Sequence, residues 1–231
     1  MKKIIILIFL WLIAASAYGN AGECYAGKDI IVTNRETKAE KATFAGGCFW
    51  CMEHAFEKMD GVNKVISGYT GGHIEDPTYE EVCAGRTGHF EAVQLLYNPD
   101  RVNYQSLLDV YWMQIDPTDE GGQFVDRGSQ YTTAIFYHND EQKRLAEISK
   151  KHLAKSGRYE EPIVAEIIKF SKFYEAEEYH QDYCKKNPLK YKYYRDRSGR
   201  DQYLNKIWGN KSEEDLGKEG YEKYKELFSN F

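Results

Sequence analysis

The stretch Ala45–Glu53, "AGGCFWCME", decides the fold around it and raises the question of function. The preceding residues "KATFAGG" (41–47) have the composition of a short buried strand that ends at two glycines, which permit a tight turn. After the turn, apolar side chains recur at the spacing of one helical face, at Met52, Ala55, Phe56 and Met59. The stretch therefore predicts a strand-to-helix turn that carries Cys48 and Cys51.

The rest of the chain continues to alternate between strands and helices. Further strands are expected over 62–72, 89–99, 131–137 and 163–170, and helices over 76–85, 103–115, 139–157 and 174–188. The last helix is expected to stop at Pro188, and the long loop 116–131 is expected to be functional. This order predicts an α+β fold, an α/β sandwich in which helices pack on a mixed central sheet.

The N-terminus has the pattern of a signal peptide over residues 1–21: two lysines, an apolar run, then small residues. The apolar run from Ile4 to Ala17 is shorter than the roughly 20 residues that span a bilayer. We therefore expect export to the periplasm or another extracytoplasmic space, without stable membrane association after cleavage. An uncleaved N-terminal anchor is the alternative. A polar segment (22–40) follows, and a charged, helical tail closes the chain (210–231).

Charge and cysteine content exclude some classes of function. The formal net charge of −5, from 31 basic and 36 acidic residues, gives no overall basic field for nucleic acid. Five cysteines, an odd number, suit redox chemistry in an exported protein better than a framework of structural disulfides. The 19 tyrosines mostly indicate packing, with a few available as placed hydroxyl donors.

The C-x-x-C spacing is compatible with several chemistries. A structural zinc site needs four ligands, but Cys83 and Cys184 stand alone in the sequence, so no metal is expected. A thioredoxin-type dithiol–disulfide oxidoreductase would place Cys48 at a helix N-terminus, where the helix dipole stabilises a thiolate. Phe49 and Trp50, however, would build an apolar wall where such motifs have small or polar residues. This enzyme class remains the alternative, as does an exported binding module with an aromatic pocket.

An aromatic wall beside a nucleophilic thiol suits a small apolar group with partial positive charge, such as a methyl on oxidised sulfur. At this point the sequence resembles a known family. "GCFWCME" is similar to the signature of the peptide-methionine (S)-S-oxide reductases, the MsrA family. The likeness continues in the same order through "GYTGG", "PTYEEVCAGRTGHFEAV", "DPTD", "DRGSQYTTAIF" and "AEEYHQDYCKKNP".

The resemblance covers residues 41–209 and implies a catalytic domain with a ferredoxin-like fold. It implies reduction of methionine-S-sulfoxide, free and in oxidised proteins, to methionine. It assigns Cys48 as nucleophile, Glu91 as proton donor, Tyr79 and Tyr131 as hydroxyl donors, Phe49 and Trp50 as the methyl pocket, and Asp126 as a substrate-binding residue. Glu53 and His180 are expected to be structural.

After oxygen transfer, a sulfenic acid at Cys48 needs a second thiol to form a disulfide. Many relatives carry this thiol near the C-terminus, but here no cysteine follows Cys184. Cys51 is the first choice for the resolving cysteine and Cys184 the second. The resemblance implies no metal or organic cofactor, a thioredoxin-like protein or dithiothreitol as external reductant, and a monomer.

Overall fold

The computed structural model describes residues 39–209. The predicted signal peptide, residues 22–38 and the C-terminal tail lie outside this range. The elements are β1 (Glu40–Gly46), α1 (Phe49–Phe56), β2 (Val62–Thr70), α2 (Tyr79–Cys83), β3 (Phe90–Tyr97), α3 (Tyr104–Trp112), β4 (Gly122–Gln123), β5 (Asp126–Arg127), η1 (Ser129–Tyr131), β6 (Thr133–Tyr137), α4 (Asp140–Lys155), β7 (Glu166–Lys169), β8 (Phe173–Glu175), α5 (Tyr183–Lys186), α6 (Pro188–Arg197) and α7 (Arg200–Trp208). None of the helices in this part of the chain combines the length and the hydrophobicity needed to cross a bilayer.

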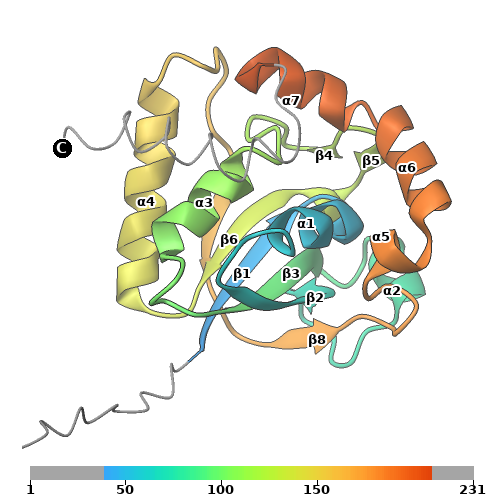
Figure 1. Ribbon diagram of the computed structural model, residues 1–231. Helices are drawn as coiled ribbons and strands as arrows, with labels where there is room; N and C mark the ends of the chain where they lie inside the picture. Colours follow the sequence, from blue (N-terminus) through green and yellow to red (C-terminus); the bar gives the residue numbers. More distant parts are fainter. Residues whose placement is uncertain (1–38, 210–231) are drawn as a thin grey trace, which may run out of the picture. The chain divides into compact units, whose positions relative to one another are not determined.

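A mixed six-stranded sheet of order β7-β6-β1-β3-β2-β8 organises the domain (Figure 1). The β6–β7 pair is parallel, whereas the other neighbouring strands are antiparallel. β3 lies between β1 and β2, which α1 connects, and β1 lies between β3 and β6, which α3 connects. Two interlocked split β-α-β units of this kind form the ferredoxin-like arrangement. The predicted α+β fold with a mixed central sheet is confirmed.

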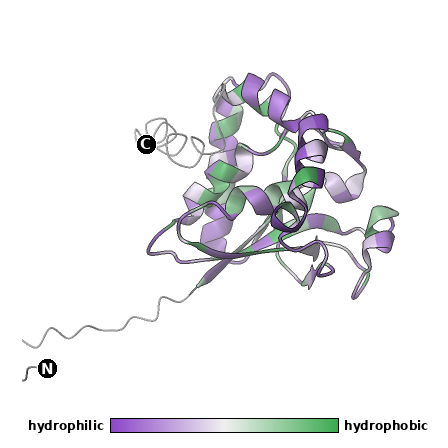
Figure 2. Ribbon diagram, turned by 45° about the vertical axis from the view of Figure 1, so that its right-hand side comes forward, coloured by the Kyte–Doolittle hydropathy of each residue, from purple (hydrophilic) through white to green (hydrophobic). Residues whose placement is uncertain are grey.

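The two faces of the sheet bury different side chains. One face packs against α1, α3 and α4 and contributes Phe44, Val93 and Leu95 to the main core. The opposite face buries a smaller cluster that includes Ala45, Ala92 and Ala134. Because strand residues alternate between faces, Glu91, the residue before Ala92, points toward α1. The helices carry both hydrophobic and hydrophilic stretches (Figure 2), as expected for elements with one buried face.

Most helix boundaries follow local capping chemistry. The side chain of Asn103 accepts the Ser106 N–H and that of Asn139 accepts the Gln142 N–H, so these two residues are the N-caps of α3 and α4. At α2 the cap is Thr78, which forms a reciprocal capping box with Glu81.

The predicted helix over 174–188 is wrong. Residues 173–175 form β8, an edge strand that pairs with β2, and only Tyr183–Lys186 form a short helix. Pro188 does not stop a helix but begins α6, where its missing N–H costs nothing because the first helical N–H has no partner. β7 is likewise shorter than the predicted 163–170 strand. Edge-strand pairing, which no local periodicity reveals, determines the structure of this segment.

Candidate active site

The strand-to-helix turn forms as the sequence predicts. Cys48 is the N-cap of α1, and its carbonyl accepts the backbone N–H groups of Cys51 (3.1 Å) and Met52 (3.4 Å). Gly47 has φ +78°, and a Cβ there would lie 2.5 Å from the Gln123 side chain. Only glycine fits this position without strain. The turn thereby places the Cys48 thiol at the N-terminal end of a helix.

A cavity with about 240 Å³ of empty space, part of it open to solvent, lies at this turn. It is lined by Cys48, Phe49, Trp50, Tyr79, Glu91, Asp126, Tyr131 and Tyr194. The structure thus brings together every residue predicted as catalytic or substrate-binding. These residues come from α1, α2, β3, β5, η1 and α6, so the site is assembled from distant parts of the chain.

Glu91 is the buried carboxyl of the cavity. It is 2 % exposed, and its Oε2 accepts the backbone N–H of Phe49 at 3.1 Å. Burial raises the pKa of Glu91 from 4.5 to about 8, and the negative charges of Asp126 and Cys51 add to the shift, although the Phe49 N–H opposes it. The carboxyl is therefore mostly protonated at neutral pH and can donate a proton into the cavity.

The two tyrosine hydroxyls flank the Cys83 thiol. The Tyr131 hydroxyl lies 3.9 Å from Cys83 Sγ, and Tyr79 also forms a hydrogen bond with that thiol. Burial raises the pKa of both tyrosines, so they remain neutral donors. The start of α2, and with it Tyr79, is held in place because Glu177 accepts the Tyr79 N–H (2.9 Å) and the Tyr69 O–H (2.9 Å).

Aromatic contacts fix the Trp50 ring. The ring stacks on Tyr183, with centroids 3.8 Å apart and an interplanar angle of 7°, and meets Tyr194 edge-on. The indole N–H donates to His180 Nδ1 at 3.1 Å. The His180 ring also lies 4.9 Å from the Phe49 ring. His180 thus orients the aromatic wall, in line with its predicted structural role.

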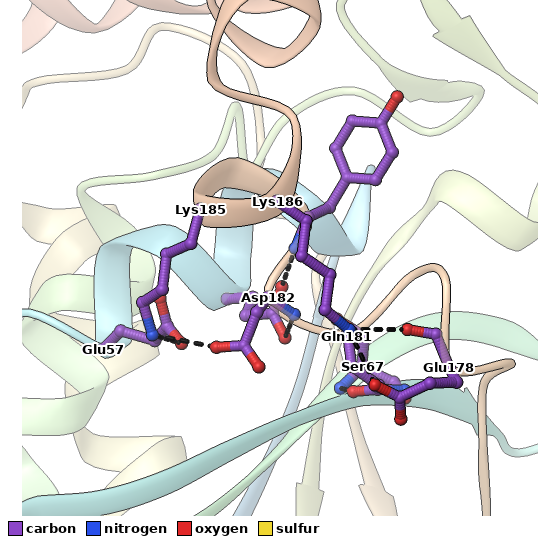
Figure 3. Close-up of polar contacts among 9 residues, drawn as sticks. Glu57, Ser67, Glu178, Gln181, Asp182, Lys185 and Lys186 are labelled. Carbon is purple, nitrogen blue, oxygen red and sulfur yellow. Dashed lines mark hydrogen bonds and ion pairs between the residues drawn. The ribbon is translucent and has the colours of Figure 1, made fainter.

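The segment that supplies His180 and Tyr183 is fastened to the sheet and to α1 (Figure 3). Gln181 bonds both backbone groups of Ser67 on β2, at 3.0 and 2.9 Å. Buried Glu53 accepts the backbone N–H groups of Asp182 and Tyr183, and burial raises its pKa to about 7. Lys185 bridges Asp182 and Glu57 on the surface, where Figure 3 shows it between the two carboxylates. These bonds fix His180 and Tyr183, which in turn hold the Trp50 ring of the aromatic wall in place.

The two thiols of the C-x-x-C stretch are hydrogen-bonded to each other and buried. Cys48 is 5 % exposed and Cys51 0 %. Burial raises the pKa of Cys48, whereas the Cys48 thiol and the guanidinium groups of Arg200 and Arg195 lower the pKa of Cys51. Cys184, on α5, is half-buried and packs with Trp50 against the same cluster. Both predicted resolving cysteines therefore lie near the cavity, and Cys51 makes the direct contact.

Sequence reasoning missed several side chains of the site. Tyr194 lines the cavity, and its hydroxyl donates to Asp126. Glu177 anchors Tyr79, and Arg195 and Arg200 approach Cys51 from α6 and α7. The density of tyrosine and arginine in "YKYYRDRSGR" was the one available signal. Within residues 39–209, no three His, Cys, Asp or Glu side chains cluster as a metal ion would require.

Comparisons with known proteins all match one family. The family model described as "Peptide methionine sulfoxide reductase" matches residues 40–212. A relative from Bacillus licheniformis, called "Peptide methionine sulfoxide reductase MsrA", is 59% identical over 177 residues, which are 77% of this chain and 98% of the relative.

Solved structures agree with these sequence matches. The structure titled "Crystal structure of Mxr1 from Saccharomyces cerevisiae in reduced form" matches with a TM-score of 0.60 and 34% identity, covering 67% of this chain and 88% of that one. "Methionine sulfoxide reductase A of Corynebacterium diphtheriae" matches with a TM-score of 0.60 and 32% identity, covering 67% of this chain and 78% of that one.

Replacing Glu91 by Gln is expected to change how stability depends on pH. Folding raises the pKa of Glu91 from 4.5 to about 8, so the folded protein binds a proton that the unfolded chain releases. The free energy of unfolding of the unmodified protein therefore falls as pH rises through this window. The free energy of unfolding of Glu91→Gln should therefore rise relative to that of the unmodified protein, by up to about 1.4 kcal/mol per pH unit between about pH 4.5 and 8. Urea denaturation at about pH 5, 6.5 and 8 measures it.

The exposed Glu120 provides the matched control, since Glu120→Gln makes the same chemical change at the surface. Its difference from the unmodified protein should stay nearly constant with pH. Parallel pH profiles for the unmodified protein and Glu91→Gln would contradict the buried, neutral carboxyl.

Proposed function

The chain belongs to the peptide methionine sulfoxide reductase family and reduces methionine-S-sulfoxide to methionine, and we propose that Cys48, Glu91 and Tyr79 with Tyr131 carry out the oxygen transfer. The observation that carries this assignment is the composition of one cavity. A thiol at a helix start, a carboxyl with a pKa of about 8 and two neutral phenols line the same small space. This set supplies a nucleophile for sulfur and proton donors for oxygen.

Sulfoxide reduction needs both functions because the oxygen gains negative charge as the sulfur is attacked. The Cys48 sulfur attacks the sulfoxide sulfur while the Glu91 carboxyl donates its proton to the oxygen. The Tyr79 and Tyr131 hydroxyls donate hydrogen bonds to the same oxygen and stabilise the developing charge. The hydroxyl group then passes to the Cys48 sulfur as the bonds of the substrate sulfur to oxygen and to Cys48 break, which leaves methionine and a sulfenic acid on Cys48. The proton that the Cys48 thiol releases returns Glu91 to its acid form.

The aromatic wall and Asp126 bind the substrate. Phe49 and Trp50 enclose the methyl group on the oxidised sulfur, which carries partial positive charge and favours contact with ring faces. The wall is fixed before substrate arrives because Tyr183 and His180 hold the indole. Asp126, oriented by the Tyr194 hydroxyl, binds the substrate backbone or a water molecule.

Cys51 resolves the sulfenic acid. Its thiol already contacts the Cys48 thiol, so a disulfide between them forms without a rearrangement of α1. A thioredoxin-like protein then reduces the disulfide by thiol–disulfide exchange, and dithiothreitol replaces it in vitro. The protein works as a monomer, without a metal or an organic cofactor, on free methionine sulfoxide and on oxidised proteins.

Reaction of the reduced protein with each sulfoxide epimer, without external reductant, tests the chemistry. The S epimer should yield about one equivalent of methionine per chain, and the protein should lose two hydrogens as the disulfide forms, which intact mass spectrometry detects. The R epimer should yield none. Cys48→Ser should form no methionine, and methionine formation by this variant would disprove the assigned nucleophile.

The choice of resolving cysteine is tested with Cys51→Ser and Cys184→Ser as a matched pair. Cys51→Ser should still form methionine once, but it should accumulate a Cys48 sulfenic acid that dimedone traps, and its turnover with a thioredoxin-like reductant should fall by about 100-fold or more. Cys184→Ser should turn over normally. The reverse pattern would make Cys184 the resolving cysteine.

Export of the protein is part of the same proposal, and it is motivated by the signal-peptide pattern of residues 1–21. Expression of the full chain in a bacterium with a periplasm should release a shortened protein into the periplasmic fraction, with an intact mass that places its first residue near 20–22. A chain that lacks residues 1–21 is the control and should stay in the cytoplasm. An unshortened protein in the membrane fraction would favour the N-terminal anchor instead.

A further inference from the structure

Arg200 is the first residue of α7, and its side chain is fully buried against the strand-to-helix turn of the active site. It is 0 % exposed, although arginine is among the residues that are most rarely buried. Its Nη2 donates to the backbone carbonyl of Gly46 at 3.0 Å, and its Nη1 donates to that of Gln114 at 2.5 Å. One guanidinium therefore joins the end of β1 to the segment that follows α3.

The Gly46 side of this contact lies directly before the nucleophile. Gly46 is the last residue of β1, and two residues later Cys48 is the N-cap of α1. A Cβ on Gly47 would lie 3.0 Å from Arg200 Nη2, so the guanidinium also packs against the turn itself. The position of the turn, and with it that of Cys48, therefore depends on Arg200.

The guanidinium also lies against the hairpin that presents Asp126. Its Cζ atom is 4.7 Å from the centroid of the Phe124 ring, a cation–π contact. Phe124 lies in the turn between β4 and β5 with φ +57°, a conformation that a bulky residue rarely adopts. The Tyr203 ring of α7 meets the Phe124 ring edge-on, with centroids 5.6 Å apart. α7 thus holds the turn of the hairpin, and Asp126 begins the strand that follows.

The positive charge of Arg200 acts on the carboxyl group that this hairpin presents. Burial raises the pKa of Asp126, whereas the hydrogen bond from the Tyr194 hydroxyl and the charge of Arg200 oppose this rise. Within residues 39–209 the hydrogen-bond acceptors of the guanidinium are backbone carbonyls, and Nε has no acceptor. Arg200 therefore supports Asp126 in two ways, by packing on the hairpin and by favouring the ionised carboxylate.

We propose that Arg200 is the positioning residue that joins the Cys48 turn to the Asp126 hairpin, and that it thereby fixes the nucleophile relative to the substrate-binding carboxylate. A sulfoxide that contacts Asp126 then meets the Cys48 sulfur in the orientation for attack. Lysine cannot replace this arginine, because a single ammonium group lacks the planar fork that reaches two carbonyls and covers the Phe124 ring. The inference rests on the proposed function, in which Cys48 attacks the sulfoxide and Asp126 binds the substrate.

Arg158 provides a matched control, since it makes the same kinds of contact at the other end of α7. Its Nη1 donates to the Ile207 carbonyl at 2.7 Å, and its guanidinium lies 4.1 Å from the centroid of the Trp208 ring. Neither partner lines the cavity. Arg158→Lys therefore weakens the packing of α7 without removing a contact to the turn or to the hairpin.

Single-turnover methionine formation from the S epimer, without external reductant, tests the proposal. Arg200→Lys should raise the half-saturating sulfoxide concentration by about 10-fold, because Asp126 is displaced, and lower the saturated rate by about 10-fold, because the Cys48 turn is released. Arg158→Lys should leave both values within about twofold of those of the unmodified protein. An unchanged half-saturating concentration in Arg200→Lys would overturn the proposal.

A double-mutant cycle separates positioning from general destabilisation. If Arg200 acts on substrate binding through Asp126, Arg200→Lys should raise the half-saturating concentration of an Asp126→Asn protein by less than about threefold. The full tenfold increase in the Asp126→Asn protein would show that Arg200 acts elsewhere, and it would contradict the proposal.

Phe124→Leu is the second variant, which keeps the proposal testable if Arg200→Lys does not fold. It removes the ring on the hairpin and leaves both carbonyl acceptors of Arg200 in place. The half-saturating concentration should rise by about threefold or more, while the saturated rate should stay within about twofold of that of the unmodified protein. Any other pattern would contradict the link between Arg200, the hairpin and substrate binding.

Amide hydrogen exchange, measured without substrate, keeps this inference separate from the proposed function. In Arg200→Lys the exchange should become faster in residues 46–49 and 122–127 together, whereas Arg158→Lys should accelerate it only near residue 158 and in the last turn of α7. Unchanged protection of either segment in Arg200→Lys would overturn the inference. A protein that shows the expected exchange but forms no methionine would refute the proposed function alone.

Discussion

The hydrogen bond from the Phe49 backbone N–H to the Glu91 carboxyl is the interaction on which the rest of the site depends. The first N–H groups of a helix have no partner within the helix, and here a buried side chain of the neighbouring strand β3 supplies one. The same bond fixes the start of α1, and with it Cys48, against the centre of the sheet. It also holds the carboxyl inside the cavity, where burial keeps it protonated near pH 7. Nucleophile and acid are therefore positioned by one contact.

The second half of the site comes from a segment that has little regular structure of its own. Residues 176–187 bring His180 and Tyr183 against Trp50, and they are held by side chains that reach backbone groups, chiefly Gln181 and Glu53. These hydrogen bonds give the segment fixed positions for His180 and Tyr183, although most of it is neither helix nor strand. The wall is complete before substrate enters, so binding costs little ordering of side chains.

The sequence predicts the first half of this arrangement better than the second. Hydrophobic periodicity and two glycines locate β1, α1 and the thiols, and the family resemblance assigns Glu91. The prediction of a helix over 174–188 was wrong because the structure of this segment depends on pairing with β2 and on the contacts of Gln181 with Ser67. These partners are distant in sequence. Arg195 and Arg200 were missed for a related reason, since an arginine in a polar helix is normally a surface residue. Only the fold shows that both guanidinium groups are buried beside Cys51.

Burial of the thiol pair also separates this site from that of a dithiol–disulfide oxidoreductase. In exchange between dithiols and protein disulfides the leaving group is a thiolate, which needs no proton from a buried acid. A sulfoxide oxygen does need one, and the Glu91 carboxyl, which is mostly neutral near pH 7, can supply it. Cys48 is 5 % exposed behind an aromatic wall and Cys51 is fully covered. A disulfide between two thiols that are this well covered must become more accessible before another protein can reduce it.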